Sequence, residues 1–129
     1  MKAIQIKEVG APEMLHWQDV PDLPAPAAGQ ARVKLMATGL NYIDVYLRSG
    51  TCLHAFPLPT IPGLEGAGIV EAVGAGVETV KLGDRAAYYR VRGSYAEASN
   101  APTNLIVRSL KVAGGDVANK TATRETLLQ

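Results

Sequence analysis

Cysteine and histidine are scarce in this sequence, and charge of neither sign dominates. The 129 residues include one cysteine and two histidines. A structural zinc site usually takes four such ligands, so these residues cannot build one. Cys52 has no intramolecular disulfide partner, which is typical of a protein from a reducing cytoplasm. The formal net charge of +1 gives no reason to expect nucleic acid or an anionic membrane surface as a partner.

Long hydrophobic runs are also absent. The longest uncharged segment, residues 49–64, is interrupted by three prolines, so it predicts no membrane span. The start of the chain carries Lys2, Lys7 and Glu8 and has no apolar segment, so no signal peptide is expected. We therefore expect a cytoplasmic protein. Its hydrophobic fraction of 47% is sufficient for one globular domain with a buried core.

Alternating hydrophobic residues predict short strands along most of the chain. In residues 31–39, we expect Ala31, Val33, Leu35 and Ala37 to share one face of a strand. Further strands are expected at residues 2–7, 65–77, 83–90, 93–99 and 104–110. The prolines of residues 21–30 predict a loop. This pattern is mainly β and is closest to a partly closed barrel with short helices.

The segment LNYIDVYLRSG changes to a helical period. We expect Leu40, Ile43 and Leu47 to share one face of a short helix that is capped by Asn41 and ends at Gly50. Elsewhere, Trp17 is predicted to lie in the core. The two histidines, His16 and His54, have no partner motif and are expected at the surface or in loops.

The segment IPGLEGAG, residues 61–68, places three glycines around one carboxylate. Gly63, Gly66 and Gly68 predict a tight bend or the close approach of a neighbouring segment. We expect Glu65 to accept backbone N–H bonds and fix this loop, in preference to a direct role in catalysis. No side chain of the sequence is predicted to be catalytic.

Three segments together resemble one known family. ATGLNYIDVYLRSG, PTIPGLEGAGIVEAVGAGVETVKLGDRAAY and GSYAEA are similar, in order and spacing, to the GroES-like half of the medium-chain dehydrogenase/reductase superfamily. Within it, the chain most resembles the bacterial NADPH:quinone oxidoreductases of the zeta-crystallin-like branch. The resemblance implies a GroES-like domain over residues 1–109, with residues 110–129 as a linker or tail.

Two positions distinguish this sequence from the zinc alcohol dehydrogenases of the same superfamily. In those enzymes, a cysteine precedes the short helix, a histidine precedes the glutamate of the glycine segment, and both bind the catalytic zinc. Asn41 and Leu64 stand at these positions; Asn is a weak zinc ligand and Leu is none. The resemblance therefore implies a zinc-independent reductase in which Glu65 remains without a metal.

The resemblance also implies that the helix start contacts the nicotinamide end of NADPH. Carried over by position, the cofactor-binding candidates are Asn41, Tyr42, Ile43, Asp44, Val45 and Tyr46. The candidates for the substrate cleft are Asn41, Tyr46, Leu64 and Glu65. Tyr42 and Tyr46 are four residues apart, so one helical face can present both rings to a flat ligand.

A simpler interpretation of the helix stays open. Ile43 and Leu47 would then be core residues, and the two tyrosines would be ordinary amphipathic surface residues. Asp44 would cap the helix start or pair with Arg48 one turn later.

No Rossmann domain is expected in this chain. Gly74 and Gly76 begin a G-x-G-x-x-G pattern, but Thr79 stands at its third position and residues 81–84 predict a turn. One βαβ unit takes about 30 residues, and only 27 residues follow Pro102. The tail TATRETLLQ is either a helix-prone tail or a remnant of a downstream segment of quinone reductases.

The sequence thus supports two functions of different classes. One is the substrate-side domain of an NADPH-dependent quinone oxidoreductase, which moves a hydride to a quinone or related enone and is inactive without a nucleotide-binding domain. Its partners would be a quinone-type small molecule and either a Rossmann domain in trans or a second copy of the chain. The alternative is a non-catalytic GroES-like binding or assembly module. A zinc alcohol dehydrogenase is disfavoured by Asn41 and Leu64.

Overall fold

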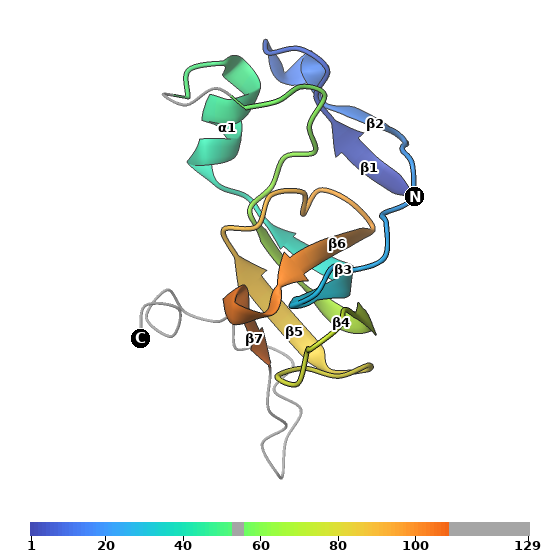
Figure 1. The fold of residues 1–129 in the computed structure, drawn as a ribbon. Coiled ribbons are helices and arrows are strands. Elements are labelled where there is room, and N and C mark those ends of the chain that lie inside the picture. Colours follow the sequence, from blue (N-terminus) through green and yellow to red (C-terminus); the bar gives the residue numbers. More distant parts are fainter. Residues whose placement is uncertain (53–55, 109–129) are drawn as a thin grey trace.

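A computed structural model describes residues 1–52 and 56–108 of the chain (Figure 1). His54 and the predicted tail lie outside the described residues. The elements in chain order are β1 (Lys2–Gln5), β2 (His16–Asp19), β3 (Gln30–Gly39), α1 (Tyr42–Ser49), β4 (Glu65–Val73), β5 (Arg85–Tyr89), β6 (Ala98–Pro102) and β7 (Ile106–Arg108). Two single-turn 3₁₀ helices, Pro12–Met14 and Thr103–Leu105, precede β2 and β7. The mainly β class predicted from the sequence is confirmed.

The strands form two antiparallel sheets. Five strands pair in the order β6-β3-β4-β5-β7, and β1 pairs with β2 in a separate hairpin. Single bridges, Ala3 to Ala96 and Ile6 to Thr60, tie the hairpin strand β1 to the rest of the domain. Within the described residues the sheets do not join into a closed barrel. Figure 1 shows α1 and the hairpin at one end, beyond the five-stranded sheet.

The core lies on one face of the large sheet. Ala31 and Val33 on β3, Val70 on β4, and Ala86 and Tyr88 on β5 are buried together. These strands have inward residues at every second position, as alternation requires. The predicted inward positions of Ala31 and Val33 are confirmed.

A bulge in β3 ends this alternation. Leu35 pairs with Gly68, and Ala37 pairs with the next residue of β4, Ala67, so Met36 is the extra residue. A bulge inserts one residue and changes which face the following side chains occupy. Ala37 is therefore exposed, and its predicted place on the inner face is wrong.

Helix α1 begins and ends where the sequence predicts. Asn41 is the N-cap in an extended conformation, and Gly50 ends the helix with a φ of 78°, a value that glycine adopts without strain. The predicted face of Leu40, Ile43 and Leu47 is not the buried face of the helix. Leu47 is buried, but Leu40 is 84% exposed and precedes the helix. Asp44 takes the other buried position.

Two other predictions are wrong. Trp17 is 60% exposed; its strand, β2, pairs with β1 in a hairpin separate from the large sheet that carries the core. Residues 93–97 are a loop, and β6 begins only at Ala98. The predicted turn at residues 81–84 is confirmed by the bond from the Asp84 N–H to the Lys81 carbonyl at 3.1 Å. Among the helices of the described residues, none has the length and apolar character that crossing a membrane requires.

Candidate functional site

The glycine segment 61–68 has the close contacts that its composition predicts. Gly63 has a φ of 86°, and a Cβ at this position would collide with Ser94 and Tyr95. A Cβ on Gly66 or Gly68 would likewise run into the neighbouring strands. These glycines let β4 start directly against its neighbours, and they place Leu64 and Glu65 at the end of the sheet nearest α1.

Two of the cleft candidates are in contact. The side-chain amide of Asn41 donates a hydrogen bond to Oε1 of Glu65. Asn41 is exposed at the helix start, and Glu65 is half-buried at the first position of β4. The bond found for this carboxylate among the described residues is thus made by a side chain and not by the backbone N–H groups we expected. Leu64 is half-buried next to it, and its carbonyl accepts the N–H of Val91 at 3.3 Å.

The helix start presents an exposed aromatic and apolar surface. Tyr42 is 80% and Tyr46 is 50% exposed, and Ile43 and Val45 are also exposed. The side chains of the cofactor-binding candidates are therefore accessible, with one exception. Asp44 points inward and is buried. The placement of Ile43 also contradicts the interpretation in which it belongs to the core.

Asp44 caps the start of the helix from within. One carboxylate oxygen, Oδ2, accepts the backbone N–H of Asn41 at 2.9 Å and the hydroxyl of Tyr95 at 2.8 Å. The other oxygen is buried and has no hydrogen-bond partner among the described residues. Burial, and then the bond to Asp44, raise the pKa of Tyr95 far above its ordinary value. Arg48 does not pair with Asp44, because its guanidinium donates to the Gly10 carbonyl.

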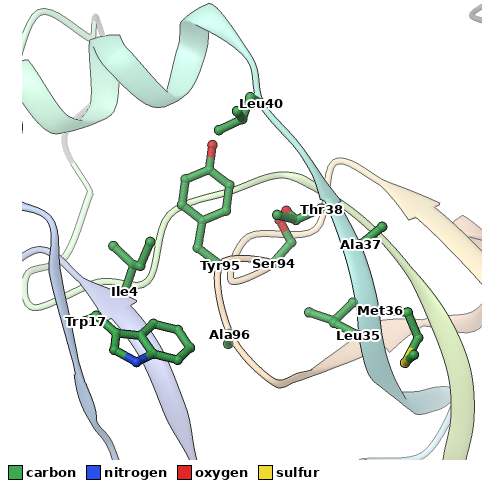
Figure 2. A pocket seen from close by; sticks show the side chains of 10 residues that line it. All are labelled: Ile4, Trp17, Leu35, Met36, Ala37, Thr38, Leu40, Ser94, Tyr95 and Ala96. Atoms are coloured by element: carbon green, nitrogen blue, oxygen red, sulfur yellow. The ribbon is translucent and has the colours of Figure 1, made fainter.

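A hollow of about 360 Å³ lies beside this site and was not predicted from the sequence (Figure 2). Ile4 and Trp17 form one wall, and the end of β3 forms the other. Its lining residues are Ile4, Trp17, Leu35, Met36, Ala37, Thr38, Leu40, Ser94, Tyr95 and Ala96. They come from four separate segments, so no local pattern in the sequence could have revealed the hollow. Of these residues, Tyr95 also contacts the helix start through Asp44.

The donor atoms at the two zinc positions do not fit zinc. The amide nitrogen of Asn41 donates to Glu65, and Leu64 offers no side-chain ligand atom. Within residues 1–52 and 56–108, no three His, Cys, Asp or Glu side chains gather closely enough to hold a metal ion.

The chain belongs to the alcohol dehydrogenase GroES-like domain family, whose sequence model matches residues 27–128. Among curated proteins, it is 44% identical over 98 residues to the quinone oxidoreductase of Rattus norvegicus, a match that covers 75% of this chain and 30% of the relative. The resemblance to quinone oxidoreductases inferred from the three sequence segments is confirmed.

Solved structures agree with this relationship. The quinone oxidoreductase of Pseudomonas syringae pv. Tomato DC3000 is 43% identical with a TM-score of 0.78, and the match covers 84% of this chain and 33% of that one. The Escherichia coli quinone oxidoreductase, solved in complex with NADPH, is 34% identical with a TM-score of 0.79 over the same shares of the two chains. This chain thus spans about a third of the length of the relatives it matches.

Proposed function

We propose that this chain forms the substrate-side domain of an NADPH-dependent quinone oxidoreductase that works without zinc. The observation that carries the proposal is the hydrogen bond between Asn41 and Glu65. It engages the side chain of Asn41, which stands at one of the two zinc-ligand positions of the resembled dehydrogenases, and it joins the helix start to the glycine segment. The relationship to quinone oxidoreductases, one of them solved with NADPH, supports the same reaction.

NADPH supplies the hydride in this reaction, and the quinone takes up that hydride together with one proton. The residues of this chain would form the wall that holds the reacting rings. The exposed rings of Tyr42 and Tyr46, with Val45 and Ile43, offer an apolar and aromatic surface for a flat ring. Asn41 and Glu65, with Leu64 beside them, would form the polar end of the cleft.

The described residues fit only one end of the cofactor. Most of the affinity for a dinucleotide comes from a pyrophosphate at a helix N-terminus and from an adenosine pocket. The first turn of α1 carries the carboxylate of Asp44, which accepts the N–H of Asn41, and a negative charge at this place disfavours a phosphate. We therefore propose that the chain is inactive alone and needs a Rossmann domain, in the same polypeptide or in trans.

A domain exchange tests the proposal. Residues 1–108 of this chain would replace the matching third of the Escherichia coli quinone oxidoreductase. We expect the hybrid enzyme to oxidise NADPH in the presence of 1,4-benzoquinone and to keep its activity after treatment with a zinc chelator. The unfused chain should show no turnover. A folded hybrid that binds NADPH but reduces no quinone would favour the non-catalytic binding or assembly module.

A further inference from the structure

Tyr95 contacts both segments that carry the cleft candidates: the glycine segment, residues 61–68, and the start of α1. These two segments are the two walls of the candidate cleft. Its backbone N–H donates to the Pro62 carbonyl at 3.1 Å, and the N–H of Gly93 donates to the Gly63 carbonyl at 2.9 Å. These bonds hold the loop of residues 93–97 on the segment that leads directly into Leu64 and Glu65. The backbone of Tyr95 is therefore part of the glycine-segment wall.

The side chain of Tyr95 reaches the opposite wall. Its hydroxyl donates to Oδ2 of Asp44 in the first turn of α1, although the two residues are 51 positions apart in the sequence. Each of the two residues is 8% exposed. The same Oδ2 atom accepts the N–H of Asn41, so the Tyr95 hydroxyl and the Asn41 backbone are fixed on one buried atom.

These contacts close into a ring. Asn41, held through its backbone by Asp44, donates its side-chain amide to Glu65, and Glu65 follows the segment that carries the backbone of Tyr95. The second oxygen of Asp44 has no hydrogen-bond partner in the described part of the chain. Asp44 therefore stabilises the helix start through one carboxylate oxygen, Oδ2, which accepts from the Asn41 N–H and the Tyr95 hydroxyl.

We propose that Tyr95 is a positioning residue for hydride transfer. Acting through Asp44, it fixes the amide of Asn41 against Glu65 and so sets the separation of the two cleft walls. This inference rests on the proposed function for its role in the reaction. It also assigns Asp44 a place behind the cleft, supporting the exposed residues of the helix start and not contacting the cofactor.

A first experiment tests the contact in the chain itself by NMR. The side-chain amide resonance of Asn41 is compared, at one neutral pH, between each chain and the same chain carrying Glu65→Gln. We expect Glu65→Gln to move the resonance, because it removes the carboxylate that accepts this amide. Tyr95→Phe should abolish most of the movement, because the helix start is released. Tyr88→Phe is the matched control, since Tyr88 is also buried but has no bond to α1, and it should keep the movement.

Asp44→Ala serves as the second variant if circular dichroism shows that Tyr95→Phe does not fold. It removes the acceptor of both bonds and should also abolish the movement. If a folded Tyr95→Phe or Asp44→Ala chain retains the full movement of the Asn41 resonance, the proposed positioning is overturned.

A second experiment uses the hybrid enzyme with the Escherichia coli nucleotide-binding domain. Misplacement of a reacting group by about 1 Å can cost up to roughly 100-fold in rate. We expect Tyr95→Phe to lower kcat by about tenfold or more, with KM for NADPH and for 1,4-benzoquinone nearly unchanged. A purely structural residue would lower thermal stability and leave kcat of the folded enzyme intact, and that result would overturn the proposal. Tyr88→Phe should leave both constants unchanged.

The two experiments separate the proposals. If the unsubstituted hybrid has no turnover, the proposed function fails and the role of Tyr95 in the reaction fails with it. The NMR comparison still decides whether Tyr95 holds Asn41 against Glu65. If turnover is present and the Asn41 resonance is insensitive to Tyr95→Phe, the proposed function stands and the positioning role fails alone.

Discussion

Gly39 makes room for the side chain of Glu65. The two residues pair across β3 and β4, and a Cβ placed on Gly39 would lie 2.9 Å from the Glu65 Cβ and in collision with its Oε2. A Cβ atom essentially never comes this close to a nonbonded atom of another residue, so a larger residue would displace the carboxylate that Asn41 contacts. The absence of a side chain at position 39 is thus a condition for the bond between the helix start and the glycine segment.

Gly39→Ala should destabilise the domain and separate Asn41 from Glu65. Overpacking at a site that cannot relax costs about 1–3 kcal/mol, and we expect a loss of this order in the free energy of unfolding, measured by urea denaturation. Gly10→Ala is the control, because its added Cβ would meet only the flexible side chain of Met14, at Cγ and Sδ. That variant should change stability by less than about 0.5 kcal/mol. Equal effects of the two substitutions would contradict the prediction.

Stability should fall in strongly alkaline solution because of Tyr95. Burial, and then the hydrogen bond to Asp44, raise the pKa of Tyr95 above its ordinary value near 10. A raised pKa in the folded state means that folding favours the protonated phenol. This contribution is complete below pH 10 and is lost as pH rises above it, since the unfolded chain then releases the proton more readily.

Urea denaturation over a series of alkaline pH values measures this loss. Burial also raises the pKa of Tyr88, so Tyr95→Phe should remove only part of the pH dependence. Leu82→Ala is the control, because Leu82 is exposed and carries no ionisable group, and it should leave the pH dependence as it is. A Tyr95→Phe chain with an unchanged alkaline slope would show that this phenol does not titrate differently in the two states.

The purified chain should bind no stoichiometric zinc. The reason is the donor set at the two positions, an amide at Asn41 and an aliphatic side chain at Leu64, which cannot replace a thiolate and an imidazole. Elemental analysis after dialysis measures the metal content, and circular dichroism before and after chelation measures its structural effect. One equivalent of zinc, lost on chelation together with the β-sheet signal, would refute the expectation.

The chain alone should bind NADPH at millimolar concentrations or more weakly. Contacts to one ring must offset the cost of immobilising a long ligand, which amounts to several kcal/mol, so a binding free energy of about −4 kcal/mol is the upper limit we expect. Nicotinamide fluorescence titration measures the affinity. Micromolar binding, or steady reduction of 1,4-benzoquinone, would show that the chain already holds a dinucleotide site.

Tyr46→Phe distinguishes the chain from the complete enzyme. In the chain alone this substitution should change nothing that the titration detects. In the hybrid enzyme it should slow hydride transfer, if the Tyr46 hydroxyl lines the cleft as we propose. Leu82→Ala, at an exposed position in the turn before β5, is a control that should leave the rate unaffected. An equally fast Tyr46→Phe hybrid would remove this residue from the cleft.

The sequence predicts features that depend on local chemistry. The helix between Asn41 and Gly50 follows from a cap, a period and a stop within eleven residues. The close contacts of Gly63 and Gly68 are predicted by the three glycines within residues 61–68, because such a cluster usually marks a tight bend or the close approach of a neighbouring segment. In both cases the information lies within a few residues of the element it specifies.

Features that depend on distant segments could not be predicted. Asp44 is buried with a hydrogen bond from Tyr95, which is 51 positions away in the sequence. No pattern around either residue predicts that the two are in contact. Trp17 has the large apolar side chain that is typical of a core residue, but it lies on the hairpin outside the large sheet and is exposed. The hollow beside the site is formed by four segments that only the tertiary fold brings together.

The bulge at Met36 divides β3 into two halves with different tasks. Before it, Ala31 and Val33 fill the core; after it, Thr38 bonds to Ser94 at 2.8 Å and the strand leads into Asn41. Since a shift of one residue turns every later side chain to the opposite face, the number of residues in β3 matters as much as their identity. Deleting Met36 would leave the core half in place and turn the helix start away from Glu65. The orientation of the whole site is thus set by one supernumerary residue whose own side chain faces solvent.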